Sequence, residues 1–254
     1  MYLNQLFGLD EAVSIVTGGG RGIGQVLAEA LAKAGSDVAI LSRGSAEDTV
    51  ALVEAAGRRG VWVPCDVTDE ESVKGAVAEV ERRLGPIRVL VNNAGTCIHQ
   101  TSFEGTVADF RSVVDTNLTG PFITARVVAA SMKAAGTPGS IINVASISGT
   151  IVNTPQMQAS YNASKAGLIH LSRSLAYELV GTGIRVNALS PGYVATPMST
   201  DTPDDLRAAW EPLFPMGRMA DPNELVPALL YLTSPAASYT TGSDVVVDGG
   251  YTLV

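Results

Sequence analysis

Short runs of apolar, mostly β-branched residues recur along the whole chain, and segments with helical spacing of apolar residues separate them. The runs that we interpret as strands are 13–18, 37–42, 61–66, 87–95, 140–146, 184–190 and 244–248. Helices are expected at 23–35, 46–58, 69–85, 106–115, 118–135, 160–180 and 223–233, with one short helix inside the Pro-rich stretch 191–222. Apolar strands that alternate with helices predict an α/β fold, a doubly wound parallel sheet of about seven strands with helices on both faces. No linker or repeat divides the chain, so we expect a single domain over residues 1–254.

The composition excludes several classes of protein. A net charge of −8 disfavours nucleic acid and anionic membranes as partners, and no apolar run is long enough to span a bilayer. The first residues lack the basic and apolar regions of a signal peptide, so we expect a cytoplasmic protein. Two cysteines and two histidines in 254 residues predict neither a disulfide framework nor a metal site. The expected partner is a small molecule.

A glycine-rich turn, "TGGGRGIG" at 17–24, joins the first strand to the first helix. It has the pattern T-G-x-x-x-G-x-G, with Gly18, Gly22 and Gly24 at the fixed positions. Glycines allow close backbone approach, and the following helix offers free N–H groups to a phosphate. The turn therefore predicts a dinucleotide site, although a closely packed structural turn has the same composition.

Three more motifs follow in order: "NNAG" at 92–95, "YNASK" at 161–165 and "PG" at 191–192. Together with the glycine turn they resemble the short-chain dehydrogenase/reductase family over essentially the whole chain. The resemblance implies a Rossmann fold, NAD or NADP as cofactor, interconversion of alcohols and carbonyls, and a substrate-covering segment at about 191–222. The loop before the YNASK motif and the C-terminal "DGGYTLV" resemble the members that act on polyols and sugars, of the galactitol, arabinitol and sorbose/gluconate type.

The resemblance also implies a set of cofactor contacts. Asp66 and Val67 would flank the adenine, the NNAG turn would line the cofactor, and Thr196 would fix the nicotinamide face for pro-S transfer. The implied contacts are Gly18, Gly20, Arg21, Gly22, Ile23, Gly24, Asp66, Val67, Asn93, Ala94, Gly95, Tyr161, Lys165, Pro191, Gly192, Val194 and Thr196.

The end of the second strand bears on the choice between the two cofactors. An acidic residue there selects NAD, whereas an arginine can hold the 2′-phosphate of NADP. This strand ends in Ser42 and Arg43, and Arg21 adds a second positive charge from the glycine turn. We therefore predict that NADP(H) is favoured over NAD(H). The alternative is that both arginines are ordinary solvated surface residues.

A proton-transfer group is predicted around Tyr161 and Lys165. Residues four apart share a helix face, about 5–6 Å apart at Cβ, and a positive charge close to a phenol lowers its pKa. By resemblance, Asn117 would hold a water against the lysine, although it could instead be a locally capped residue at a helix kink. The substrate serine is Ser146 by alignment on the strand end, and Ser148 by its distance from Tyr161. The local pattern favours Ser146, with Ser148 as a possible substrate contact.

The loop at 149–158 is two residues longer than is common in the family, and we expect it to border the substrate. Asn153, Gln156 and Gln158 could bind hydroxyl groups, and His99 could line the pocket, or these could be ordinary loop residues. The prediction is an NADP(H)-dependent oxidoreductase for a polyol or ketose. The alternatives are a 3-oxoacyl thioester reductase, a general carbonyl reductase and a non-catalytic NADP-binding regulator. A homotetramer or homodimer built on the helices 118–135 and 160–180 is implied by the resemblance.

Overall fold

A seven-stranded parallel sheet forms the centre of the computed structural model, which describes residues 2–253 apart from the side chain of Met198. The strand order is β3-β2-β1-β4-β5-β6-β7, and every neighbouring pair is parallel. The strands are β1 (Val13–Thr17), β2 (Asp37–Ser42), β3 (Gly60–Pro64), β4 (Val89–Asn92), β5 (Gly139–Val144), β6 (Ile184–Pro191) and β7 (Asp244–Val247). The chain leaves β1 toward one edge and returns at β4 on its other side, so the strand order reverses between β1 and β4. A ligand site is expected at the carboxyl ends of strands at such a reversal.

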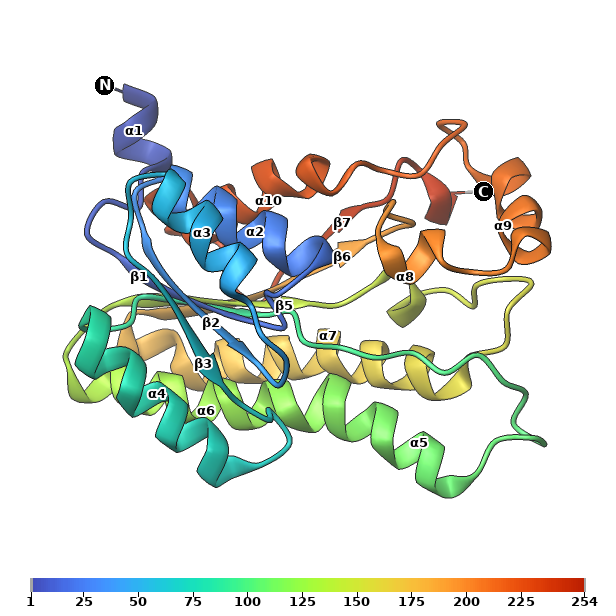
Figure 1. Cartoon of the computed structure of the whole chain (residues 1–254), viewed down its shortest axis with the longest axis horizontal. Coiled ribbons are helices and arrows are strands. Elements are labelled where there is room, and N and C mark those ends of the chain that lie inside the picture. The colour runs from blue at the N-terminus through green and yellow to red at the C-terminus, as the bar shows by residue number, and fades with distance from the viewer. Residues whose placement is uncertain (1, 254) are drawn as a thin grey trace.

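Helices cover both faces of the sheet (Figure 1). On one face lie α2 (Gly22–Lys33), α3 (Glu47–Ala55) and α10 (Val226–Thr233). On the other lie α4 (Glu70–Leu84), α5 (Val107–Val114), α6 (Gly120–Ala134) and α7 (Ala159–Leu179). Successive residues of a strand point to opposite faces, so Ile15 packs into the core beneath α4 and α6 while Val16 packs beneath α2. An apolar core results on each side of the sheet, and a smaller apolar cluster of Ala145, Leu168, Ile169 and Ala188 lies where α7 packs on β6.

The expected elements are present, with several corrections. β4 is shorter than the predicted strand 87–95, because the chain leaves the sheet after Asn92 to form a polar turn. A helix that was not expected, α1 (Tyr2–Phe7), projects from the end of the molecule opposite α8 and α9 (Figure 1). The stretch 191–222 contains two helices instead of one, α8 (Pro197–Thr200) and α9 (Asp204–Trp210). α10 follows a 3₁₀ turn at Pro222–Leu225, so the α-helix starts later than predicted.

The two helices predicted at 106–115 and 118–135 are joined without a break. A π-helical turn, Asp115–Thr119, connects α5 to α6. A π turn adds a residue to the helical repeat and redirects the side chains within it, and such turns are frequent at functional sites. Asn117 lies in the middle of this turn and is fully buried.

Helices α4 and α5 each begin with a side-chain cap, whereas α2, which follows the glycine turn, has none. Asp69 accepts a hydrogen bond from the Glu71 N–H at the start of α4, and Thr106 and Asp109 form a capping box at the start of α5. α2 begins after Arg21, which is extended and makes no side-chain cap bond. The first N–H groups of α2 are therefore open to a ligand rather than held by a capping side chain.

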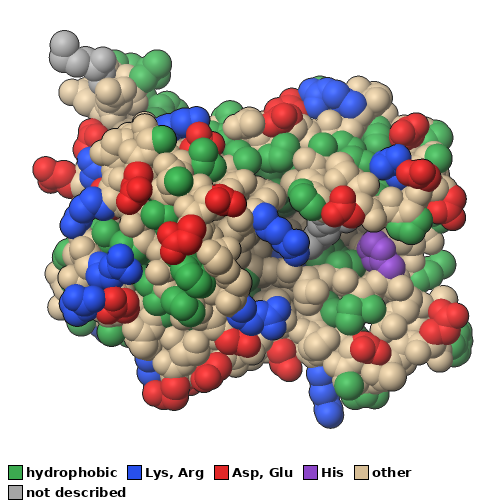
Figure 2. Space-filling view, viewed as in Figure 1, with side chains coloured by type: hydrophobic (Ala, Val, Ile, Leu, Met, Phe, Trp, Pro, Cys, Tyr) green, Lys and Arg blue, Asp and Glu red, His purple; other side chains and the backbone are tan. Residues whose placement is uncertain are grey.

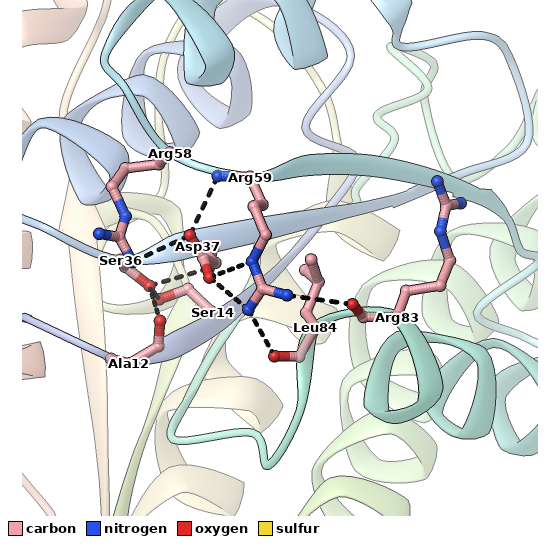
Figure 3. A network of polar contacts seen from close by, with 8 residues as sticks. All are labelled: Ala12, Ser14, Ser36, Asp37, Arg58, Arg59, Arg83 and Leu84. Carbon is pink, nitrogen blue, oxygen red and sulfur yellow. Dashed lines mark hydrogen bonds and ion pairs between the residues drawn. The ribbon is translucent and has the colours of Figure 1, made fainter.

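A charged network holds the amino ends of the strands, at the sheet edge away from this turn (Figure 3). The buried carboxylate of Asp37 accepts hydrogen bonds from the Arg59 backbone N–H at 3.0 Å and Nε at 2.8 Å, and pairs with Arg58 at 2.9 Å. Arg59 also donates to the carbonyls of Arg83 and Leu84 at the end of α4. Burial alone would raise the pKa of Asp37, but the bonds from Arg59 and both arginine charges hold it below its usual range. This network joins β2, β3 and α4 and lies far from the candidate site.

Candidate active site

The glycine turn and the NNAG turn are fastened to each other. Thr17 Oγ1 accepts hydrogen bonds from the backbone N–H groups of Asn93 and Ala94, both at 3.0 Å. Asn93 Nδ2 donates in return to the carbonyls of Thr17 and Gly18, both at 3.1 Å. A Cβ on Gly18 would lie 2.8 Å from Ala94 Cα, so the two turns approach each other too closely for any other residue. The motifs at the ends of β1 and β4 therefore form one unit.

Two further glycines of the turn are required by their geometry. A Cβ on Gly24 would lie 2.4 Å from Asn93 Nδ2, and Gly22 has a φ of 57°, in the left-handed region. Gly22 also faces Thr196, because a Cβ there would lie 3.7 Å from Thr196 Cβ. The start of α2 thus lies opposite the segment that follows β6. Gly20 lies beside Ser45 and Ala46, and Ile23 packs against the core beneath α2.

The predicted nicotinamide segment follows β6. Pro191 ends the strand and Gly192 donates its N–H to the Val247 carbonyl at 3.0 Å. A Cβ on Gly192 would lie 2.8 Å from Asp248 Cα, so this position also requires glycine. Val194 is buried and pairs with Ala220 in an isolated bridge. Thr196, also buried, precedes α8.

The predicted adenosine end lies at the carboxyl ends of β2 and β3. Ser42 Oγ donates to the Gly44 carbonyl at 2.7 Å, and Arg43 is exposed. Asp66 Oδ1 accepts hydrogen bonds from both the N–H and the hydroxyl of Thr68, and these bonds, helped by the charge of Arg43, lower the pKa of Asp66. Val67 is buried against the start of α6, where a Cβ on Gly120 would lie 2.9 Å from it. Arg21 is exposed at the start of α2, and the space-filling view shows basic side chains at the edge of a hollow between α2 and α8 (Figure 2).

The four residues predicted to carry out proton transfer converge from three elements. Lys165 is buried on α7 and its Nζ donates to the Val144 carbonyl, at the end of β5, at 2.7 Å. The same Nζ lies 5.6 Å from the centre of the Tyr161 ring. Ser146, just beyond β5, hydrogen-bonds to Tyr161. The carboxyl end of β5 and the first turns of α7 therefore bring these three side chains together.

Asn117 joins this group through the NNAG turn. Its Oδ1 accepts from the Thr96 N–H, and its Nδ2 donates to the Thr96 carbonyl, both at 2.8 Å, and to Ser164 on α7 at 3.1 Å. A Cβ on Gly95 would lie 3.3 Å from Asn117 Oδ1 and 3.8 Å from Lys165 Nζ, so Gly95 lies between the amide and the ammonium. The π turn agrees with the distorted helix of the alternative, but the Asn117 side chain is not capped locally, because its hydrogen bonds go to Thr96 and to Ser164. The water-holding role stays a prediction.

The expected lowering of the Tyr161 pKa is wrong for the free chain. Although part of this side chain reaches solvent, burial of the hydroxyl raises the pKa of Tyr161 to about 12, and the nearby Cys97 thiol contributes in the same direction. The hydrogen bond from Ser146 opposes the shift only in part. Burial also lowers the pKa of Lys165 to about 8. Desolvation of both groups thus outweighs the attraction that the i, i+4 spacing suggested.

The two candidate serines have different bonding. Ser146 Oγ donates to Ser148 Oγ at 3.1 Å and accepts from the Ser148 N–H at 3.1 Å. Ser148 Oγ donates in turn to Asn153 Oδ1 at 2.6 Å. The Ser148 proton is therefore committed to Asn153, while the Ser146 hydroxyl faces Tyr161 and can redirect its proton. This favours Ser146 as the residue that binds the reacting oxygen.

The residues predicted to contact substrate bind mainly to one another. Asn153, Gln156 and Gln158 are all buried. Gln158 Nε2 donates to Ser148 at 3.3 Å and to Asn162 at 3.0 Å. His99 is exposed overall, but partial desolvation of its ring lowers its pKa, and a hydrogen bond that the imidazole makes to Gln158 opposes this shift. The structure therefore brings these residues together beside Ser146, and their role as substrate contacts stays a prediction.

Three residues at this site were missed by sequence reasoning. Cys97 Sγ lies 3.6 Å from Gln158 Oε1, and burial raises its pKa to about 12. Tyr193 and Trp210 both hydrogen-bond to Gln156. Two signals in the sequence were available for these residues. Tyr193 directly follows the Pro-Gly pair, and Trp210 is a tryptophan within a Pro-rich stretch.

A glycine turn before an uncapped helix, beside a Tyr–Lys pair at the carboxyl edge of a Rossmann-type sheet, is the arrangement expected of a nicotinamide-dependent oxidoreductase. Residues 18–252 match the family model described as enoyl-(acyl carrier protein) reductase. The chain is 42% identical over 250 residues to galactitol 2-dehydrogenase (L-tagatose-forming) of Cereibacter sphaeroides, covering 98% of each. It is 44% identical to a probable NADP-dependent mannitol dehydrogenase of Yarrowia lipolytica, covering 96% of this chain and 89% of that one.

The solved structures agree. A short-chain type dehydrogenase/reductase from Mycobacterium marinum superposes with a TM-score of 0.96 at 40% identity, covering 98% of this chain and 99% of that one. The chain belongs to the short-chain dehydrogenase/reductase family, and it is a short-chain alcohol dehydrogenase/reductase.

The contrast between the two serines gives a direct test. We expect Ser146→Ala to lower kcat by about 100-fold or more, because it removes the hydroxyl at the reacting oxygen. Ser148→Ala should lower kcat by less than about tenfold, since only the orientation of Ser146 is affected. Steady-state kinetics would measure both, with the exposed Ser174→Ala on α7 as a control. Equal losses for the two site variants would contradict the assignment of the role to Ser146 alone, and a larger loss for Ser148→Ala would assign the substrate serine to Ser148.

Proposed function

We propose that this protein is an NADP(H)-dependent oxidoreductase that interconverts a secondary alcohol and a ketone on a polyol, a ketose or a related sugar. One observation carries the proposal: Ser146, Tyr161 and Lys165 meet at the carboxyl edge of the sheet, next to the glycine turn. A wall of amide and hydroxyl side chains adjoins them. Short-chain dehydrogenases of this kind combine a nicotinamide cofactor with a tyrosine that exchanges the substrate proton.

The chain has the features that hold such a cofactor. The uncapped start of α2 can bind the diphosphate, and Gly18 and Gly24 allow the turn before it to pack tightly against the NNAG turn. We propose that Asp66 and Val67 flank the adenine and that residues 191–196 hold the nicotinamide. The bound cofactor would accept or deliver the hydride. The remaining steps belong to the protein.

In the oxidation direction, Tyr161 would first release its own proton to solvent, favoured by a positive charge bound beside it, and the phenolate would then take the hydroxyl proton as the carbon–hydrogen bond breaks. Ser146 would donate a hydrogen bond to the same oxygen, which stabilises the charge that develops there. Lys165, held on the Val144 carbonyl, would place its charge beside the phenol. In reduction the proton returns from Tyr161 to the new hydroxyl oxygen. We propose that Asn117 orders the NNAG turn beside the ammonium.

The preference for NADP(H) is argued from charge. Strand β2 ends in Ser42 and Arg43 with no carboxylate to repel a 2′-phosphate, and the Arg43 guanidinium is exposed and available. Arg21 lies at the start of α2, from which it can reach the same ligand. The name of the Yarrowia lipolytica relative supports the same choice.

The substrate class is argued from the polar wall and from the relatives. Ser148, Asn153 and Gln158 offer several hydrogen-bonding groups in a small buried region, which suits a molecule with several hydroxyl groups. The named relatives act on galactitol and mannitol. We further propose that the chain is one domain and that residues 191–222 cover the bound substrate.

We propose that the protein assembles as a homodimer or homotetramer through α5, α6 and α7. These helices expose Phe110, Phe122 and Tyr177, and a hollow of about 410 Å³ lined by Leu118, Phe122 and His170 lies between α6 and α7. Apolar side chains around such a hollow suit a second copy of the same face.

The activity can be tested with a substrate panel. We expect NADP⁺-dependent oxidation of at least one of galactitol, mannitol and arabinitol, and NADPH-dependent reduction of the matching ketose. Tyr161→Phe should lower kcat by about 100-fold or more while NADPH still binds, because only the proton path is lost. Absorbance at the nicotinamide band and a fluorescence titration would measure these. Turnover confined to an acetoacetyl thioester would replace the sugar proposal with a thioester reductase.

The cofactor preference depends on Arg43. Arg43→Ala should raise KM for NADPH by about tenfold or more and leave KM for NADH within about twofold, because a charge-assisted bond to the 2′-phosphate is lost. The control is Arg83→Ala, an exposed arginine at the amino edge of the sheet. A wild-type preference for NADH, or an equal effect on both cofactors, would contradict the proposal.

The mass of the protein in solution tests the proposed assembly. Light scattering of the purified protein should give two or four times the 26.3 kDa chain mass. Phe122→Glu should shift the protein toward smaller species, since a charge would be buried in the contact. A monomer for the wild-type chain would rule the assembly out.

A further inference from the structure

Helix α9, in the segment proposed to cover the substrate, is attached to the body of the protein by very few side chains. Trp210 is the one buried residue of this helix, at 3% exposure, whereas Asp204, Asp205 and Ala208 are exposed. The residues that follow are also mostly exposed, with Phe214 half-buried. Trp210 is therefore the buried anchor of α9.

Trp210 is bound to the loop that precedes α7. Its Nε1 donates to Gln156 Oε1 at 2.8 Å. An indole nitrogen can only donate, so this bond fixes which end of the amide is oxygen. Gln156 Nε2 must then face the other way, and it donates to the Tyr193 hydroxyl at 2.7 Å. The buried Gln156 side chain thus has both of its polar atoms engaged, one on each neighbouring segment.

Tyr193 is the third member of this contact. Its ring lies 4.8 Å from Trp210, 5.3 Å from Phe214 and 5.2 Å from Tyr251, measured between ring centres. It lies between Gly192 and Val194, in the segment proposed to hold the nicotinamide. The loop 150–158, the segment after β6 and α9 therefore meet at one point.

The same contact continues to the candidate catalytic serine. Asn153 Nδ2 lies 3.5 Å from the Tyr193 hydroxyl, and Asn153 Oδ1 accepts from Ser148. Ser148 in turn accepts from Ser146. A displacement of Tyr193 would therefore loosen the support of Ser146 through Asn153.

We propose that Gln156, Tyr193 and Trp210 form a latch, in which Gln156 is the positioning residue that holds α9 closed over the substrate pocket and in register with Ser146. The proposal rests on the proposed function, because it requires that the pocket beside Tyr161 binds the substrate. The latch acts on geometry and not on the reacting atoms.

The latch predicts a particular kinetic pattern. Covering segments of this kind retain the substrate and exclude water, and their opening often limits turnover. Loss of one latch bond should raise KM for the alcohol by about five- to tenfold, the loss expected for one buried hydrogen bond. The kcat should change by less than about threefold, and the Kd of NADPH should be unchanged.

Three variants each remove one component. Tyr193→Phe keeps the aromatic packing and removes the hydroxyl, with its bonds to Gln156, Asn153 and Tyr251. Trp210→Phe removes the indole N–H, and Gln156→Leu removes both polar atoms at similar size. The control is Tyr231→Phe on α10, which also removes a 2.7 Å hydroxyl bond, to Thr240, outside the site. Hydrogen exchange of peptides covering 197–214 reports opening without any need for activity, and peptides from β1 and β4 report global unfolding.

Faster exchange confined to 197–214, with the raised KM, in Tyr193→Phe or Trp210→Phe would support the latch. Unchanged exchange and KM in both, or the same changes in Tyr231→Phe, would overturn it. If the wild-type protein turned over no polyol, ketose or thioester, the proposed function would be refuted. Faster exchange at 197–214 in these variants would then still support the latch as a closing contact. Exchange that rises equally in β1 and β4 would assign these residues to general stability and overturn the proposal.

Discussion

A line of buried polar side chains across the carboxyl ends of the central strands sets the positions of everything else at this site. Thr17 on β1 binds the Asn93 and Ala94 N–H groups, and Asn92 on β4 donates to Asn143 on β5 at 2.9 Å. Asn143 donates in turn to Ser172 on α7 at 2.8 Å. The bonds from Asn92 to Asn143 and from Asn143 to Ser172 are buried, where an unpaired partner would cost about 1–3 kcal/mol, so the line resists sliding of one element past another. The glycine turn is therefore held in one register with α7, whose Tyr161 lies about 140 residues further along the chain.

The pKa values of Tyr161 and Lys165 in the free chain depend on how deeply α7 is buried, and this line of hydrogen bonds holds α7 in place. Lys165 is buried, and the Val144 carbonyl offers it a hydrogen bond without a full counter-charge. Its pKa is about 8 and that of Tyr161 about 12, both displaced in the direction that disfavours charge. The free protein therefore holds no preformed tyrosinate. A positive charge bound beside the phenol would oppose this desolvation, which gives the proton chemistry a dependence on ligand binding.

The sequence predicted what depends on local patterns. Apolar runs located all seven strands, and the spacing of Gly18, Gly22 and Gly24 located a turn whose tight packing the structure shows. Local alignment at the end of β5 also separated Ser146 from Ser148, in agreement with their bonding. What the sequence could not indicate are contacts between side chains far apart in the chain, such as Trp210 with Gln156. The π turn around Asn117 was missed because its composition is that of ordinary helix, and the pKa of Tyr161 was misjudged because spacing carries no information on burial.

The mutual pairing of the polar wall changes how selectivity for a polyol must arise. The amide groups of Asn153 and Gln158 already make hydrogen bonds in the free chain. A ligand hydroxyl therefore has to replace one of these bonds. The shortest bonds, such as Ser148 to Asn153 at 2.6 Å, are costly to replace. Three longer contacts, Gln158 to Ser148 at 3.3 Å, Asn153 to Tyr193 at 3.5 Å and Cys97 to Gln158 at 3.6 Å, are weak and can be exchanged at low cost. Two of these three contacts involve Gln158, which lies beside Ser148. A substrate hydroxyl next to the reacting carbon would thus be recognised when it replaces one of the weak hydrogen bonds of Gln158. A substrate without that hydroxyl would leave these weak bonds unchanged and would gain no binding energy from Gln158.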